Sequence, residues 1–173
     1  TMMQIPLADA LAALKPLLED PAVLKIGQNI KYDMRIMARY GLAIAPIDDS
    51  MLLSYVLDGG LHGHGMDELS KLHLDHAPIP FKEVAGTGKN QITFDQVPLA
   101  NARDYAAEDA DITLRLHQVL KPRLVQEHMV TLYERLERPL APVLARMEGI
   151  GIKVERAALA RLSEDFAQRI ATL

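Results

Sequence analysis

The sequence predicts a helix-rich α/β fold. The chain has 173 residues, of which 49% are hydrophobic and only 5% aromatic, and leucine and alanine dominate. This composition favours helices over an all-β sandwich. A short apolar run at residues 23–27 ends in glycine and precedes a helical pattern, as expected of a buried strand that leads into a helix. The length allows one domain, or one domain and part of another.

Hydrophobic periodicity and capping residues define the elements of the first half. We expect a strand at 23–27, a possible short strand at 42–44, and helices at 7–18, 31–40, 50–57 and 66–74. Asn29 is the expected N-cap of the second helix, and Gly41 follows its end. Asp48 or Asp49 is expected to cap the third helix.

The second half reads as helices interrupted by proline. A long helix is expected from residue 98 to 121, where Pro122 breaks or kinks it. Helical segments follow at 124–137 and 143–148, with Pro139 and Pro142 as interruptions. Residues 149–154 suggest a short strand or turn, and 155–173 a final amphipathic helix. We therefore predict two units, residues 1–137 and residues 138–173.

Charge and composition exclude several classes of protein. The net charge of −4 shows no basic footprint for simple electrostatic binding to nucleic acid, although a metal site built of carboxylates adds negative charge of its own. Without cysteine, disulfides, zinc–cysteine sites and thiol catalysis are excluded, and a reducing, cytoplasmic location is expected. No apolar run is long enough for a membrane span, and residues 1–4 do not resemble a signal peptide.

Two acidic segments are candidates for chemistry. Tyr105 and Asp109 lie four residues apart on the long predicted helix and share one face, so the carboxylate could hold a metal while the phenol orients a water. The alternative is a half-buried tyrosine beside a solvated carboxylate. Asp111 would point about 200° around the helix from Asp109, away from such a cluster.

Asp33 is the second candidate carboxylate. It lies in the first turns of a helix that follows a buried strand, and ligand sites of α/β proteins gather at the carboxyl ends of strands. An ordinary exposed carboxylate is the alternative. Together, Asp33 and Asp109 could form part of a site for Mg²⁺ or Mn²⁺, which prefer oxygen ligands. His62 and His64 in the glycine-rich loop could also suggest a metal site, but we expect them to be exposed, because the nearby sequence offers no third ligand.

Four segments, at residues 25–33, 81–94, 105–111 and 137–154, together resemble the bacterial DNA polymerase I family, the family A DNA polymerases. Residues 25–33 (KIGQNIKYD) resemble the second exonuclease motif of that family, and residues 105–111 (YAAEDAD) resemble the third motif of tyrosine-type DEDD 3′–5′ exonucleases. Residues 81–94 are also similar to the exonuclease region, and residues 137–154 are similar to the opening of the polymerase domain. The resemblance covers essentially the whole chain in order.

The resemblance implies an RNase H-like exonuclease fold and a role for each matching residue. Asp33 would share the second of two Mg²⁺ or Mn²⁺ ions, Asp109 would bind the first, and Tyr105 would orient the attacking water. Asn29 and Tyr32 would line the groove for a single DNA strand, and Phe81 would contact its 3′ end. The parent enzyme would be a DNA-directed DNA polymerase of replication and repair, whose exonuclease removes 3′-terminal nucleotides.

The first motif of the family, an Asp-x-Glu on a first strand, has no counterpart in the sequence. We therefore expect a truncated exonuclease fold with its first strands missing, followed by helices of the polymerase domain. The piece alone is expected to have little nuclease activity, and the remaining polymerase chain and DNA are its expected partners. A non-catalytic module supporting a polymerase and a stand-alone RNase D-like exonuclease remain as alternatives.

Overall fold

The computed structural model describes residues 5–172 and confirms a helix-rich α/β fold. Residues 1–4, on which the expectation about a signal peptide depends, lie outside the described residues, as does residue 173. The elements follow in the order α1 (Leu7–Glu19), β1 (Lys25–Gly27), α2 (Lys31–Ala38), β2 (Ile47–Asp49), α3 (Ser50–Asp58), α4 (Met66–Leu74), α5 (Phe81–Ala85), η1 (Gly88–Asn90), η2 (Phe94–Gln96), α6 (Leu99–Gln126), α7 (Val130–Leu132), η3 (Tyr133–Glu137), α8 (Arg138–Ile150) and α9 (Arg156–Ala171).

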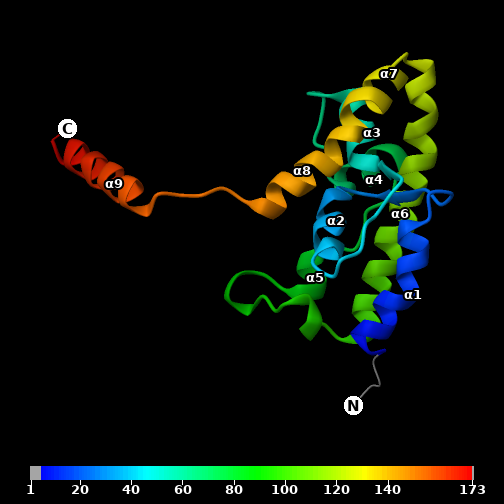
Figure 1. Cartoon of the computed structure of the whole chain (residues 1–173), viewed down its shortest axis with the longest axis horizontal. Helices are drawn as coiled ribbons and strands as arrows, with labels where there is room; N and C mark the ends of the chain where they lie inside the picture. The colour runs from blue at the N-terminus through cyan, green and yellow to red at the C-terminus, as the bar shows by residue number, and fades with distance from the viewer. Residues whose placement is uncertain (1–4, 173) are drawn as a thin grey trace.

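A small parallel sheet lies between the helices (Figure 1). β1 pairs with β2, and Gly27 lies opposite Asp49 at the carboxyl end of both strands. The expected strand at 42–44 is wrong, since pairing begins only after Pro46, whose carbonyl accepts the backbone N–H of Lys25. Leu42 is buried nevertheless, and its N–H closes the end of α2 by donating to Met37.

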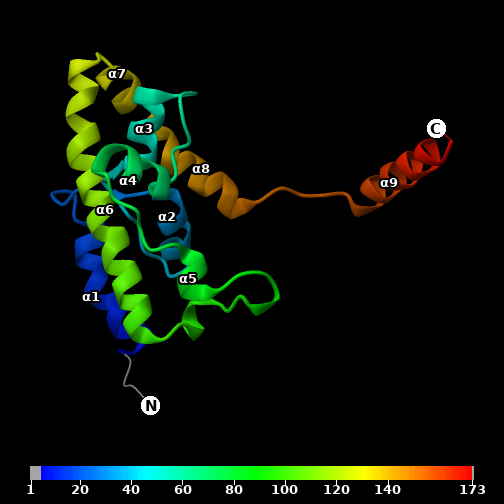
Figure 2. The same ribbon diagram turned by 180° about the vertical axis from the view of Figure 1, so that it is seen from behind.

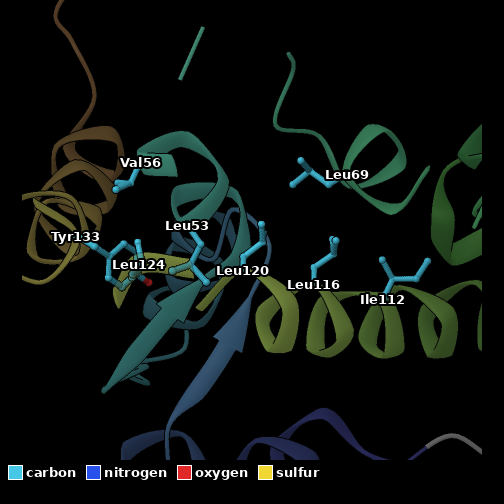
Figure 3. Packing of buried hydrophobic residues seen from close by; sticks show 8 residues of the cluster. All are labelled: Leu53, Val56, Leu69, Ile112, Leu116, Leu120, Leu124 and Tyr133. Atoms are coloured by element: carbon cyan, nitrogen blue, oxygen red, sulfur yellow. The ribbon is translucent and has the colours of Figure 1, made fainter. Parts of the chain in front are cut away.

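The main core forms where α3 and α4 pack on the second half of α6. Figure 3 shows side chains from α6 in a row facing those of α3 and α4. The buried members of this cluster are Leu53, Val56, Leu69, Ile112, Leu116, Leu120, Leu124 and Tyr133. The four members on α6 follow one another at steps of four residues, the spacing of one helix face, so this face of the helix packs against the core along this stretch.

All three expected proline interruptions, at Pro122, Pro139 and Pro142, are wrong, because each of these residues lies within a helix. α6 continues through Pro122, whose missing N–H and bulky ring disfavour a helix interior. Leu120 and Leu124 on either side of it are buried, and this packing holds the last turns of α6 in place. Pro139 lies in the first turn of α8, where no intrahelical N–H is needed, directly after the π-helical turn η3. Pro142 also lies within α8.

The C-terminal helices differ in how they are held. α8 packs on α2, and the carboxylate of Glu148 pairs with both Lys31 and Arg35. The short strand or turn expected at 149–154 is not found, because α8 extends to Ile150 and an irregular segment then leads to α9. None of the residues of α9, all of which the structure describes, is buried, and Figures 1 and 2 show this helix apart from the other elements.

Within residues 5–172, no helix is both long and apolar enough to cross a membrane. The division into residues 1–137 and 138–173 stays a prediction.

Candidate active site

The turn between β1 and α2 presents the first part of the site. Gly27 is required there, because a Cβ atom at this position would lie 2.8 Å from the side chain of Ile30. Asn29 follows in the left-handed region with φ of 57°, a conformation that asparagine adopts more readily than most residues. This tight turn brings Tyr32 and Asp33 into the first turn of α2, close to the end of the strand.

Asp49 at the end of β2 holds this turn together. Its buried carboxylate accepts hydrogen bonds from the backbone N–H groups of Asn29 and Ile30, at 3.0 and 2.9 Å. It also accepts from Met51 at 2.9 Å, so the predicted cap of α3 at Asp49 is confirmed. The prediction that Asn29 caps α2 is wrong, because Ile30 is the N-cap residue and Asn29 lies in the left-handed region, outside the extended conformation typical of an N-cap.

A cavity of about 670 Å³ lies between this turn and α6. Asn29, Tyr32 and Asp33 line it from one side, and Asp109 lines it from α6. Four of the six predicted site residues therefore share one cavity, although they come from two segments more than seventy residues apart in the sequence. Asp111 is exposed and pairs with Arg115 on another face of α6, as predicted.

Burial disfavours the ionised form of both carboxylates of the cavity, and the hydrogen bond that Tyr105 gives to Asp109 offsets only part of this effect. Loss of solvent, and then the charge of Asp49, raise the pKa of Asp33. Loss of solvent also raises the pKa of Asp109, and the charges of Glu108 and Asp67 act in the same direction. A divalent cation would reverse these effects, since it stabilises the ionised carboxylates. Hard oxygen donors of this kind fit Mg²⁺ or Mn²⁺, so the residues present are compatible with the expected metal.

Tyr105 lies one turn before Asp109 on α6, outside the lining of the cavity. Loss of solvent, and then the charge of Asp109, raise the pKa of Tyr105 to about 12, so its phenol stays protonated at neutral pH. Its ring meets Phe81 edge to face at 5.9 Å between centroids, and Phe94 lies at the same distance. Phe81 and Phe94 are each about 40% exposed, so this aromatic cluster offers an accessible surface beside the tyrosine.

Two supporting residues were missed by the sequence analysis. Phe94 completes the aromatic cluster and stacks on Phe81 with 21° between the ring planes. Glu108 anchors the segment before Phe81, because its carboxylate accepts the backbone N–H of Ile79 at 2.6 Å and contacts His76 at 2.8 Å. Glu108 could have been identified from the sequence, because it is an acidic residue directly before the candidate ligand Asp109.

The predicted exposure of the loop histidines is wrong. His62 lies against Asp58, with 16% of its side chain exposed, and His64 shares a hydrogen bond with Ser54. Asp58 and His73 on α4 each place a possible ligand atom within 4.8 Å of one on His62. His73 is thus a possible metal ligand that the sequence of the loop itself did not offer.

Comparison with known proteins defines the class. The model of a 3′–5′ exonuclease family matches residues 2–125, and the chain belongs to this family. It is 58% identical over 170 residues to DNA polymerase I of Rhizobium leguminosarum, and 44% identical over 167 residues to DNA polymerase I of Pseudomonas aeruginosa. These alignments include 98% and 94% of the chain, which spans only 17% and 18% of the relatives.

Solved structures support the fold. The chain superposes on the POL domain of Pol1 from M. smegmatis, in complex with DNA primer-template and dNTP, with a TM-score of 0.71 and 23% identity. That superposition covers 98% of this chain and 26% of the other. Brucella melitensis NrnC gives a TM-score of 0.65 at 20% identity, with 80% and 64% covered.

Proposed function

We propose that the chain is part of a DNA-directed DNA polymerase of replication and repair, located in the cytoplasm, and that its cavity removes 3′-terminal nucleotides from a single DNA strand. The observation that carries this proposal is the convergence of Asp33 and Asp109 on one cavity, with Tyr105 one turn from Asp109. The family of the chain and its likeness to DNA polymerase I support the same assignment.

Each residue has a role in the proposed reaction. Asp33 and Asp109 would bind Mg²⁺ or Mn²⁺, two ions in the complete site, and these ions would supply charge stabilisation for the phosphate undergoing hydrolysis. Tyr105, protonated at neutral pH, would hold the attacking water beside Asp109. Asp33, Asp109 and Tyr105 would thus fix the positions of the attacking water and the phosphate. Such positioning contributes a large part of the rate enhancement in catalysis of this kind.

The rims of the cavity suit a single DNA strand. Tyr32 is 61% exposed at the cavity wall, and Asn29 lies beside it. On the side of Tyr105, the exposed faces of Phe81 and Phe94 could stack on the terminal bases without regard to sequence. A strand that contacts both surfaces would pass across Asp109 and place its last phosphate near the two carboxylates.

The direct test uses the full product of the gene and a single-stranded DNA labelled at its 5′ end. With Mg²⁺, products should shorten one nucleotide at a time from the 3′ end, and a mispaired 3′ end should be degraded faster than a paired one. If the gene product polymerises DNA but releases no 3′ nucleotides, the alternative that this chain is a non-catalytic module of the polymerase would be supported instead. The 173-residue chain assayed alone is expected to show little activity.

Replacing Tyr105 by phenylalanine should lower the rate of 3′-nucleotide release by roughly 10- to 100-fold, the size of effect that follows from misplacing a reactant. The ring stays in its aromatic cluster, so the fold should not change. Because the pKa of Tyr105 is about 12, the wild-type rate should show no loss from this group between pH 7 and 10. Tyr40→Phe, at an exposed tyrosine outside the cavity, is the matched control; equal rates for the two variants would contradict the role.

A further inference from the structure

A second group of ligand atoms lies away from the candidate active site. Asp58 ends α3, His62 follows in the loop, and His73 lies on α4. One side-chain donor atom from each residue lies within 4.8 Å of the other two. All three side chains are mostly shielded from solvent, which distinguishes the group from a chance surface cluster.

The orientation of His62 leaves a lone pair facing Asp58. Its Nδ1 lies 2.7 Å from the carbonyl oxygen of Gly63 and must donate to it, because a carbonyl can only accept. In the neutral ring, Nε2 is then an acceptor, and it lies 3.7 Å from Oδ2 of Asp58, another acceptor. Metal-binding histidines commonly donate their second N–H to a backbone carbonyl in this way, which fixes the tautomer.

His73 adds an unsatisfied atom to the same group. Its Nε2 is buried and has no hydrogen-bond partner within residues 5–172. Loss of solvent, and then the charge of Arg123, lower the pKa of His73, so burial favours the neutral form of its imidazole. A buried polar atom without a partner is unfavourable, and a neutral imidazole is the form that binds a metal.

We propose that Asp58, His62 and His73 form a binding site for a divalent transition-metal ion of the Zn²⁺ class. Two imidazoles and one carboxylate are a donor set that suits Zn²⁺, with water as the fourth ligand of a tetrahedral site. Hard ions such as Mg²⁺ would not favour the two nitrogens, so the site differs in chemistry from the candidate active site.

Arg123 is compatible with this assignment. Its guanidinium contacts both carboxylate oxygens of Asp58, at 2.8 and 2.9 Å, and its Nε contacts Glu127 at 2.7 Å. Each carboxylate oxygen has two lone pairs, so Oδ2 can accept from Arg123 and still bind a metal. Two carboxylates surround one guanidinium, so the group keeps net negative charge when both imidazoles are neutral. Arg123 would orient Asp58 as an outer partner.

The metal would join two helices that support the candidate active site. Asp58 and His73 belong to α3 and α4, both of which pack on α6. α4 begins at Met66, which lines the active-site cavity and accepts a hydrogen bond from Thr113. A bound ion at the other end of α4 would close the loop at residues 59–65 and stabilise this packing, since it binds the folded state.

The test is titration of the metal-free chain with ZnCl₂ by calorimetry, together with CoCl₂ followed by visible absorption. We expect one equivalent of Zn²⁺ to bind, a tetrahedral Co²⁺ spectrum, and a higher melting temperature with Zn²⁺. His62→Ala and His73→Ala should each lose about tenfold or more in affinity, at least as much as the loss of an outer partner costs, and most of the thermal shift.

Two controls separate this site from others. His128→Asn removes an exposed histidine, and the double variant Asp33→Asn/Asp109→Asn removes the candidate active-site ligands; both should bind Zn²⁺ like the wild type. The absence of saturable one-to-one binding by the folded wild type would overturn the proposal. Unchanged affinity in a folded His73→Ala variant, shown by circular dichroism, would overturn it as well.

Discussion

Asp109→Asn should lower the rate of 3′-nucleotide release by the full gene product by about 10²- to 10³-fold, the cost of losing a preorganised group that stabilises charge in a transition state. Asparagine keeps the size of the side chain but cannot supply the negative charge that holds a divalent cation. Asp109 lines the cavity opposite the turn that carries Asp33, so Asp33→Asn should act in the same direction.

The pH dependence of this effect follows from the raised pKa of Asp109. A carboxyl group with a raised pKa takes up a proton at a higher pH than usual, so Mg²⁺ affinity should fall as the pH drops through that range. Metal binding shifts the equilibrium back towards the ionised form, and higher Mg²⁺ concentrations should therefore restore the rate at acid pH. The measurement is the Mg²⁺ concentration for half-maximal rate at several pH values.

Asp111→Asn is the matched control for Asp109→Asn. It makes the same chemical change two residues further along α6, on an exposed side chain that pairs with Arg115. Wild-type activity in Asp111→Asn and a large loss in Asp109→Asn would assign the function to one face of the helix. Equal activities in the two variants would contradict the proposed role of Asp109 as a metal ligand.

Asp48→Ala should destabilise the chain by about 3–5 kcal/mol, as expected when one partner of a buried ionic network is removed. Asp48 is fully buried, and its carboxylate contacts His117 at 2.8 Å, Lys121 at 3.0 Å and Tyr133 at 3.0 Å. Arg138 adds a longer contact at 3.4 Å. The network joins β2 to α6, η3 and α8, so its loss would leave cationic groups from several elements without their shared anion.

The network also determines the response to acid. Burial raises the pKa of Asp48, but the hydrogen bonds from His117 and Lys121 outweigh it and hold this pKa well below its usual range. A group with a lowered folded-state pKa contributes its full stability above the unfolded-state value, about 3.9, and loses it as the pH falls towards the folded-state value. The wild type should therefore lose stability below pH ~4 more steeply than Asp48→Asn does.

Urea unfolding of Asp48→Ala, Asp48→Asn and Asp104→Ala measures these differences. Asp104 is an exposed carboxylate paired with Arg103, and its removal should change the free energy of unfolding by no more than about 0.5 kcal/mol. Asp48→Asn should lie between the other two variants, because the amide oxygen can still accept hydrogen bonds from part of the network, although it carries no charge. A loss below about 1 kcal/mol in Asp48→Ala would contradict the network as a major source of stability.

The sequence was sufficient where one local pattern determines one structure. The apolar run before Gly27, the cap at Asp49 and the short helix at residues 66–74 are of this kind, and the structure confirms them. Asp33 and Asp109 were predicted from chain order and family resemblance, and both line one cavity. Their catalytic roles stay predictions.

The errors arose where a distant residue satisfies a local need. Asn29 is no cap because Asp49, on the paired strand, binds the backbone N–H groups of a left-handed turn at Asn29, and Ile30 becomes the N-cap residue. Pro122 does not end its helix because the buried leucines around it outweigh the local penalty. His62 gains its neighbour from α4, eleven residues further along the chain, and a loop sequence gives no information about that distance.

The burial pattern of α6 divides this helix into halves of unequal local stability. Its buried residues are Ile112, Thr113, Leu116, Leu120 and Leu124, whereas none of residues 99–111, all within the described part, is buried. Backbone amide hydrogens in the second half would exchange with solvent only when the core unfolds, whereas those in the first half would exchange through local unfolding. Tyr105 and Asp109 lie in the less stable half. A ligand bound in the cavity should therefore slow hydrogen exchange of the backbone amides in the turns that carry these two residues.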